Sequence, residues 1–433
     1  MTKEKHGKSK WTVWAAIVSV VVFLLSPVVI YRVKYKAAFE RRVAELAAAG
    51  YPVSLADLER RYVLPAGADN VADVYIEAFG WYVDPNEAEL EWLPARGKFI
   101  ASDEIPPYPP EVIAAIEASL EKNRRCLELL DKAAQMEYCL FPQEKYSIHA
   151  IYATDDYRSQ IKITAMLLVE RNLYLAQTQQ TEALFSSLTT SAALSDRLSA
   201  QPFLIDYLVT SAIQGLFVVD IQTCLNLTTF SEEQLLMLQQ QVRRMRDRNT
   251  LADALISERA GTLEFMQHSS LAQIKDAGYW VFGNFLDQPL FILYSLPGLN
   301  HKDAVLLLDY ADQAIEATAL PPHEQLTVFE RIDNEINNYS LIHLLLHTMS
   351  SPYSQIGRIN LRVIGSLSCA ETGLAIERYR LAHQALPESL EALVPYYLAE
   401  VPRDPFDGAP LRYIRHETGV RTSQGDWPFT FKH

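Results

Sequence analysis

Glycine is scarce in this chain, with 16 residues among 433, which is well below the average of about 7% in proteins. Tight β-turns use glycine repeatedly because they need positive φ angles, so a β-rich fold of this length is disfavoured. The hydrophobic fraction of 49% is sufficient for sizeable cores and argues against disorder. We therefore expect a mostly α-helical protein.

Motifs that carry common enzyme chemistry are absent from the sequence. It contains no GxGxxG, P-loop, GxSxG, HExxH or EF-hand pattern. The four cysteines, Cys126, Cys139, Cys224 and Cys369, form neither a CxxC pair nor a zinc-type spacing. We interpret them as small buried hydrophobic residues rather than as disulfide or metal-binding residues. No cofactor is expected from these patterns.

Acidic residues outnumber basic ones, and the formal net charge is −14. The excess is uneven, because residues 1–36 carry seven Lys or Arg and one acid, which leaves 32 basic and 52 acidic residues for the rest of the chain. Nucleic acids and anionic lipids attract basic surfaces. The acidic body is therefore not expected to bind nucleic acid, nor anionic lipid non-specifically.

Charge is also missing from the 21-residue run 11–31. A helix of this length rises about 31 Å, which matches the hydrocarbon core of a bilayer. Twelve of these residues are Val, Ile, Leu or Phe, and each favours insertion by roughly 0.3–0.6 kcal/mol near the membrane centre. Trp11, Trp14 and Tyr31 stand near the ends, as in the aromatic belts of membrane proteins. We predict a single transmembrane helix that contacts membrane lipid through residues 11–31.

A cleaved signal peptide is the alternative for this run. Its apolar region is usually about 7–15 residues long and is closely followed by small residues, whereas the small residues 47–49 follow a charged stretch. An uncleaved anchor is therefore preferred. The positive-inside rule does not fix its orientation, because four Lys precede the run and five Lys or Arg follow it closely. A short N-terminus with four lysines is costly to move across a membrane, which favours an N-terminus inside the cell.

Composition divides the chain into four regions. Residues 1–50 are the predicted anchor and its helical stalk, with Gly50 as the C-cap. Residues 51–110 contain eight prolines and are expected to form short helices and loops that wrap the body. Residues 111–350 show helical periodicity and are predicted to form a solenoid-like body that includes a helical hairpin about a polar turn. Residues 351–433 form a C-terminal region with its own turn signals.

The clearest helix start is the capping box Ser231 to Gln234, with Phe230 and Leu235 placed as a hydrophobic staple. Two other segments, 203–227 and 281–299, are apolar enough to suggest further membrane spans. They are interrupted by polar residues or prolines, namely Asp206, Gln214, Asp220 and Gln222 in the first and Asp287, Pro289 and Pro297 in the second. We predict that both are core helices of the body.

His343 and His347 offer the best metal-binding candidate, because a spacing of four places both imidazoles on one helix face. The glutamate that follows the first histidine of zinc proteases is absent, and a third ligand would have to come from another helix. We interpret both histidines as packed or helix-capping residues. The nearby carboxylates Glu330, Asp333 and Glu335 are interpreted as part of a solvated helix face.

The segment 370–413 has a distinctive pattern. It runs through Ala375-Ile-Glu-Arg-Tyr-Arg380, Leu386-Pro-Glu-Ser-Leu-Glu-Ala-Leu-Val394, Val401-Pro-Arg-Asp-Pro-Phe-Asp-Gly408 and Pro410-Leu-Arg-Tyr413. The turn chemistry predicts a short helix after Ser389, turns at 404–405 and 407–408, and a strand at 411–414. This segment resembles the C-terminal part of the major pseudopilin of type II secretion systems, in which a helix leads through a proline-containing loop into a small β-sheet. The resemblance implies a small α+β region over residues 351–433.

The whole chain also resembles a class of membrane-anchored bacterial proteins, frequent in planctomycetes, that join a helical body to such a tail. This resemblance implies an inner-membrane protein with a periplasmic body, but it does not imply any particular activity. The leader departs from pseudopilins, because Gly7 is followed by Lys8-Ser9-Lys10 and the apolar run carries no acid. Assembly into a pilus is therefore not expected.

The expected function is non-enzymatic. A helical body that has no site motif and is held on a membrane stalk is typical of a tethered scaffold, and we expect it to present its surface to protein partners in the bacterial envelope. The alternative is a membrane-anchored, metal-dependent hydrolase that uses His343 and His347.

Overall fold

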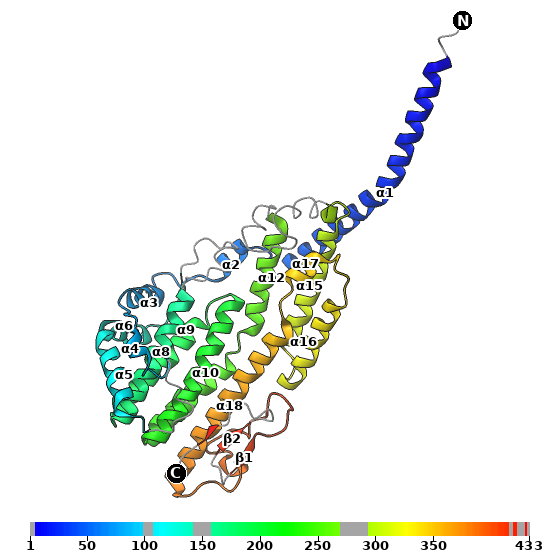
Figure 1. The fold of residues 1–433 in the computed structure, drawn as a ribbon. Helices are drawn as coiled ribbons and strands as arrows, with labels where there is room; N and C mark the ends of the chain where they lie inside the picture. Colours follow the sequence, from blue (N-terminus) through cyan, green and yellow to red (C-terminus); the bar gives the residue numbers. More distant parts are fainter. Residues whose placement is uncertain are drawn as a thin grey trace.

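A long helix projects from an elongated helical body in the computed structural model (Figure 1). The structure describes residues 5–97, 107–141, 157–268, 293–414, 419–421 and 429–430. Its helices are α1 (Lys5–Ala48), α2 (Leu55–Arg61), α3 (Val71–Gly80), α4 (Glu87–Leu90), α5 (Pro110–Lys122), α6 (Arg124–Ala134), α8 (Tyr157–Gln177), α9 (Thr181–Leu198), α10 (Leu204–Leu227), α11 (Glu232–Asp247), α12 (Leu251–His268), α15 (Leu299–Ala317), α16 (Pro322–Asn337), α17 (Leu344–Met349), α18 (Tyr353–His383) and the 3-10 helix η1 (Leu390–Leu393). The expectation of a mostly helical protein is confirmed.

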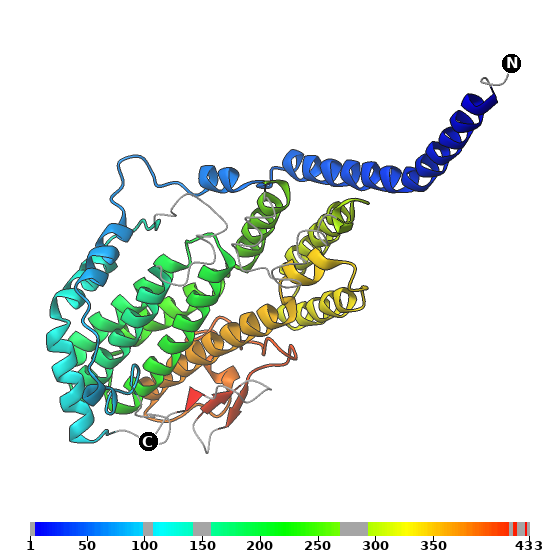
Figure 2. The same ribbon diagram turned by 45° about the horizontal axis from the view of Figure 1, so that its top comes forward.

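The projecting helix α1 contains the apolar run, and none of its most apolar stretch is buried in the body. It is long and apolar enough to span a bilayer. Figure 2 shows a bend in α1, and Pro27 inside the helix provides its cause, because proline lacks a backbone N–H and crowds the preceding turn. The helix ends at Ala48, and Gly50, the predicted capping glycine, has a φ of 80°. The Tyr51 N–H donates to the Leu46 carbonyl at 3.1 Å and so closes the C-terminal turn.

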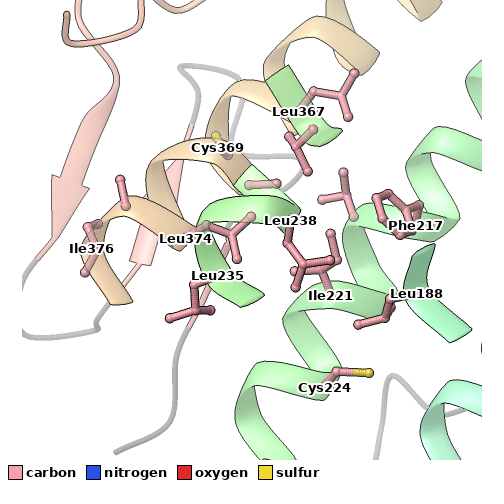
Figure 3. Packing of buried hydrophobic residues seen from close by; sticks show 14 of the residues in the cluster. Leu188, Phe217, Ile221, Cys224, Leu235, Leu238, Leu367, Cys369, Leu374 and Ile376 are labelled. Atoms are coloured by element: carbon pink, nitrogen blue, oxygen red, sulfur yellow. The ribbon is translucent and has the colours of Figure 1, made fainter. Parts of the chain in front are cut away.

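Helices α9, α10, α11 and α18 surround the largest apolar core (Figure 3). Leu188, Ile221, Leu238 and Leu374 meet there, one from each helix. The predicted capping box starts α11, since Ser231 Oγ accepts from the Gln234 N–H at 3.2 Å and the Gln234 side chain accepts from the Ser231 N–H at 2.9 Å. The staple residues are both buried in this core.

Helix α10 also passes the length and composition test for a membrane span within the described residues. Most of its apolar stretch is buried inside the body, however, and its acids have internal partners. Asp206 accepts from Arg158 Nε at 2.6 Å and from the Tyr157 hydroxyl at 2.7 Å. The prediction of a core helix for residues 203–227 is confirmed. Of the second apolar segment, residues 281–292 lie outside the described part of the chain.

Several short helices follow residue 50 and precede the longer helices of the body. Helices α3 and α6 pack together, and α8 and α9 lie beside each other on either side of the turn 178–180 (Figure 1). Arg96, in the loop after α4, is buried against Glu170 of α8, whose carboxylate accepts from Arg96 Nε at 3.0 Å. This ion pair fixes the proline-rich segment to the body.

Within the C-terminal region, η1 and a small sheet pack against α18. Strands β1 (Arg412–Ile414), β2 (Gly419–Arg421) and β3 (Phe429–Thr430) form an antiparallel sheet in the order β1-β2-β3. The turns predicted before the sheet are present, because Asp404 Oδ1 accepts from the Phe406 N–H and Asp407 Oδ1 from the Ala409 N–H, each at 2.9 Å. The short helix after Ser389 is η1, and the predicted strand is β1.

Candidate functional site

The structure places only one of the two histidines that the sequence offered as metal ligands inside a helix. His343 is the N-cap of α17, with φ −84° and ψ 66°, so only His347 lies in the helix. The expectation that both share one helix face is wrong. A spacing of four implies a shared face only when the whole interval is helical, and here a turn precedes α17, in which the His343 N–H donates to the Ser340 carbonyl at 2.9 Å.

Asp303 of α15 organises the surroundings of His343. Its carboxylate is fully buried. Oδ1 accepts from His343 Nδ1 at 2.5 Å, and Oδ2 accepts from the Tyr294 hydroxyl at 2.5 Å. Oδ2 also accepts from the backbone N–H groups of Leu345 and Leu346, at 3.1 and 3.3 Å. An acid from one helix therefore caps the N-terminus of another, where negative charge is favourable.

The second nitrogen of His343 faces Lys302, whose Nζ lies 3.4 Å from Nε2. An ammonium group only donates, so Nε2 accepts and Nδ1 carries the proton that is donated to Asp303. A metal ion needs the same Nε2 lone pair and would meet the lysine charge. His347 has a different partner, because its Nε2 lies 3.2 Å from the Tyr339 carbonyl, which only accepts. Within the part of the chain that the structure describes, no group of three His, Cys, Asp or Glu residues could hold a metal.

The Asp303–His343 pair has the form of a catalytic dyad without its nucleophile. Lysine occupies the position at Nε2 where a serine or cysteine would stand. The four cysteines are buried and free, as predicted. Burial raises the pKa of Cys126 to about 11 and the pKa of Cys139 to about 12, so both stay protonated and unreactive. Burial, with Asp303 beside it, also raises the pKa of Tyr294 far above its ordinary value, which keeps that hydroxyl a donor.

This network lies where α1 meets the body. Lys302 Nζ is 5.9 Å from the centre of the Tyr35 ring, and the rings of His301 and Phe39 are also 5.9 Å apart. Further along, Arg42 of α1 donates to Asp309 at 3.2 Å and pairs with Asp312. The two helices therefore run parallel, with the C-terminal half of α1 packed along α15.

An open cleft of about 600 Å³ lies beside the start of α18. Polar side chains from α16, α18 and the connection before α18 line it, among them Asn334, Asn337, Ser351 and Gln355. Typical small-molecule pockets are more enclosed and more apolar.

Two of the carboxylates predicted as a solvated face, Glu330 and Asp333, line this cleft. Glu330 is partly exposed and pairs with Arg358, and Glu335 pairs with Arg331 at 3.0 Å. Asp333 instead caps α18, because its oxygens accept from the N–H groups of Tyr353 and Ser354 at 3.2 and 2.8 Å. Its carboxylate therefore caps the N-terminus of α18.

The role of Asp303 was not predicted from the sequence, although one pattern in the sequence indicates it. It lies on the same helical face as Leu307, Tyr310 and Ala314, all of which are buried. An acid on an apolar stripe needs an internal partner, because a buried carboxylate without hydrogen bonds is very unfavourable.

Comparison of the chain with protein families, curated proteins and solved structures finds no match. The pseudopilin-like character of the C-terminal region therefore stays a prediction.

Proposed function

We propose that this chain is a single-pass protein of the bacterial inner membrane, and that its helical body is a scaffold for protein partners. The observation that carries the proposal is α1, whose apolar half is fully exposed while its other half is built into the body. Each large apolar side chain left in water costs of the order of 1–3 kcal/mol relative to a buried one. Residues 11–31 therefore favour a lipid environment.

The packing of α1 against the body supports a scaffold with a fixed orientation rather than a body on a flexible linker. Phe39 and Leu46 of α1 are buried in a core with Leu263 and Leu308. Arg42 adds ion pairs to two acids of α15. A body fixed in this way keeps a constant orientation toward the membrane, as a surface that aligns partners requires.

The polar cleft beside α18 supports a protein as the partner. Both of its acids already have partners, because Glu330 pairs with Arg358 and Asp333 accepts from two backbone N–H groups. Its lining of amides and hydroxyls fits the hydrogen-bonding groups of a polypeptide surface. The metal-dependent hydrolase gains no such support, because the ring nitrogens of His343 already have partners.

Cross-linking in cells tests the partner. A photoreactive amino acid at Asn337 or Gln355 of the cleft should give the same cross-linked product, and the exposed position Lys162 of α8 should give none. Reversing the charge of Glu330 to lysine should reduce the product at both cleft positions. Products of equal yield at all three positions, or none at the cleft, would contradict a partner at this surface.

The side of the membrane is tested by reporter fusions after His433. We propose that the body is periplasmic. Alkaline phosphatase folds only where disulfides can form, so we expect an active fusion. Green fluorescent protein at the same site should stay dark. An inactive phosphatase together with a fluorescent fusion would place the body in the cytoplasm.

A further inference from the structure

Four large apolar side chains are exposed near the start of α15 and of α17. Leu293 and Leu296, just before α15, are 63% and 43% exposed. Leu341 and Ile342, just before α17, are 83% and 59% exposed. We call these four residues the juxtamembrane patch. Exposed apolar side chains that gather in one place indicate a binding surface.

The position of the patch follows from the contacts of α1. A Cβ built on Gly298 would lie 2.8 Å from the Cα of Arg32, so the chain before α15 touches α1 at that residue. Arg32 is the first residue after the apolar run. Leu293 and Leu296 therefore lie a few residues from the point where the proposed span ends. Figures 1 and 2 show the start of α15 beside α1 at the end of the body from which α1 projects.

Leu341 and Ile342 of the patch lie at the same end of the body as Leu293 and Leu296. Ile342 is followed directly by His343, whose ring is bonded to Asp303 and contacts Lys302 in the first turns of α15. Lys302 in turn lies over the ring of Tyr35, one turn beyond Arg32 in α1. The buried network thus fixes Leu341 and Ile342 at the membrane-facing end of the body.

We propose that this end of the body lies on the bilayer surface and that the juxtamembrane patch inserts into the lipid interface. The inference rests on the proposed membrane anchor. Lipid is the favoured occupant because the patch lies near the point where the apolar run of α1 ends, and this part of α1 carries exposed basic residues. These are Arg32, Lys34 and Lys36, which match anionic lipid headgroups. The body then contacts the membrane at α1 and at the patch, and this second contact sets its tilt.

Spin labels on the full-length chain in vesicles of neutral and anionic phospholipids test the proposal. Single cysteines replace Leu341 or Leu293, and the labels report relative collision with oxygen, which enriches in lipid, and with a water-soluble nickel chelate. The native cysteines are buried, so the unsubstituted chain gives the labelling background. We expect an oxygen-to-nickel ratio several-fold higher at 341 and 293 than at Tyr396→Cys, an 86% exposed position after η1.

A label at Val20→Cys, within the proposed span, separates the two proposals. If Val20 reports lipid while positions 341 and 293 report water like position 396, the patch does not bind membrane and the anchor stands. If Val20 itself reports water, the anchor fails and this inference fails with it. The label at 341 could instead report water in vesicles but be shielded from the nickel chelate in native membranes. That result would assign the patch to a protein partner and would also overturn the inference.

Discussion

Asp303 is the residue on which the joint between α15 and α17 depends. It receives four hydrogen bonds, from His343, Tyr294 and two backbone N–H groups. Replacing it with alanine leaves those donors buried without their acceptor, and each such loss costs about 1–3 kcal/mol. Because losses within one network do not add in full, we expect Asp303→Ala to lower the free energy of unfolding by at least about 3 kcal/mol. Urea unfolding followed by circular dichroism measures this change.

Asp309→Ala on the same helix is the matched control. Its carboxylate is about half exposed and takes part in a surface ion pair with Arg42. Such pairs contribute about 0–1 kcal/mol. Equal losses of unfolding free energy for the two variants would show that the buried network contributes no more to stability than a surface ion pair.

Asp220 provides a pH-dependent test. Burial raises its pKa to about 7 from an ordinary 3.8, although Asn172 Nδ2 donates to it at 2.5 Å. The folded state thus holds this proton more tightly than the unfolded state. Stability from the neutral carboxyl is complete below pH 3.8 and is lost as the pH rises to about 7.

We therefore expect Asp220→Asn to change stability little near pH 4 and to stabilise the protein at pH 8. The gain should be of the order of 1–3 kcal/mol, because the amide avoids a buried charge. Chemical unfolding of both proteins at the two pH values measures it. A loss of stability of the same size at both pH values would mean that the ionised carboxylate is favoured in the folded state.

Metal content tests the roles of the two histidines. His343 Nε2 faces Lys302 and His347 is bonded to a carbonyl, so we expect less than one transition-metal ion per ten chains in purified protein, an estimate based on the missing ligand set. Elemental analysis of the full-length chain and of the His343→Ala, His347→Ala double variant should give the same value. A stoichiometric metal that the double variant loses would restore the hydrolase alternative.

At the scale of elements, the close approach of α16 and α18 depends on Gly357. A Cβ there would lie 2.3 Å from Cδ2 of the buried Phe329. Gly357→Ala should destabilise the protein by about 1–3 kcal/mol, because the clash outweighs the helix propensity of alanine. Gly215 of α10 is the control, since a Cβ there meets nothing within 4 Å. Gly215→Ala should stabilise by about 0.5–1 kcal/mol. Thermal unfolding of both variants measures the difference, and a stabilised Gly357→Ala protein would contradict this packing.

The elements that could be predicted from sequence are those whose signals are local. The capping box of α11, the end of α1 at Gly50 and the turns before β1 each depend on residues within one or two turns of the chain. The start of α17 could not be predicted, because its cap comes from Asp303, about forty residues away. For the same reason, the position of His343 outside α17 depends on tertiary contacts that no local pattern encodes.

At the scale of the whole molecule, a solvent-exposed apolar half of α1 and an acidic helical body divide the chain into two environments. Composition alone predicted this division. The parallel packing of α1 along α15 was not predictable, because it depends on side chains such as Phe39 and Arg42 meeting residues far away in the sequence. These contacts begin after residue 36, so they remain in a chain that lacks residues 1–36, although those of Arg32 and Tyr35 are lost.

Membrane fractionation of the full-length chain beside a variant that lacks residues 1–36 tests the central claim most directly. Alkaline carbonate removes peripheral proteins, including any body held only by the juxtamembrane patch, and leaves integral ones. We expect the full-length chain in the carbonate-resistant membrane and the truncated chain in the supernatant, with a strongly helical circular dichroism spectrum. Helix α10 should not retain the truncated chain, because it is packed inside the body with its buried acids. A folded truncated chain that stays in the carbonate-resistant membrane would show that another segment spans the bilayer, and it would contradict a single anchor at residues 11–31.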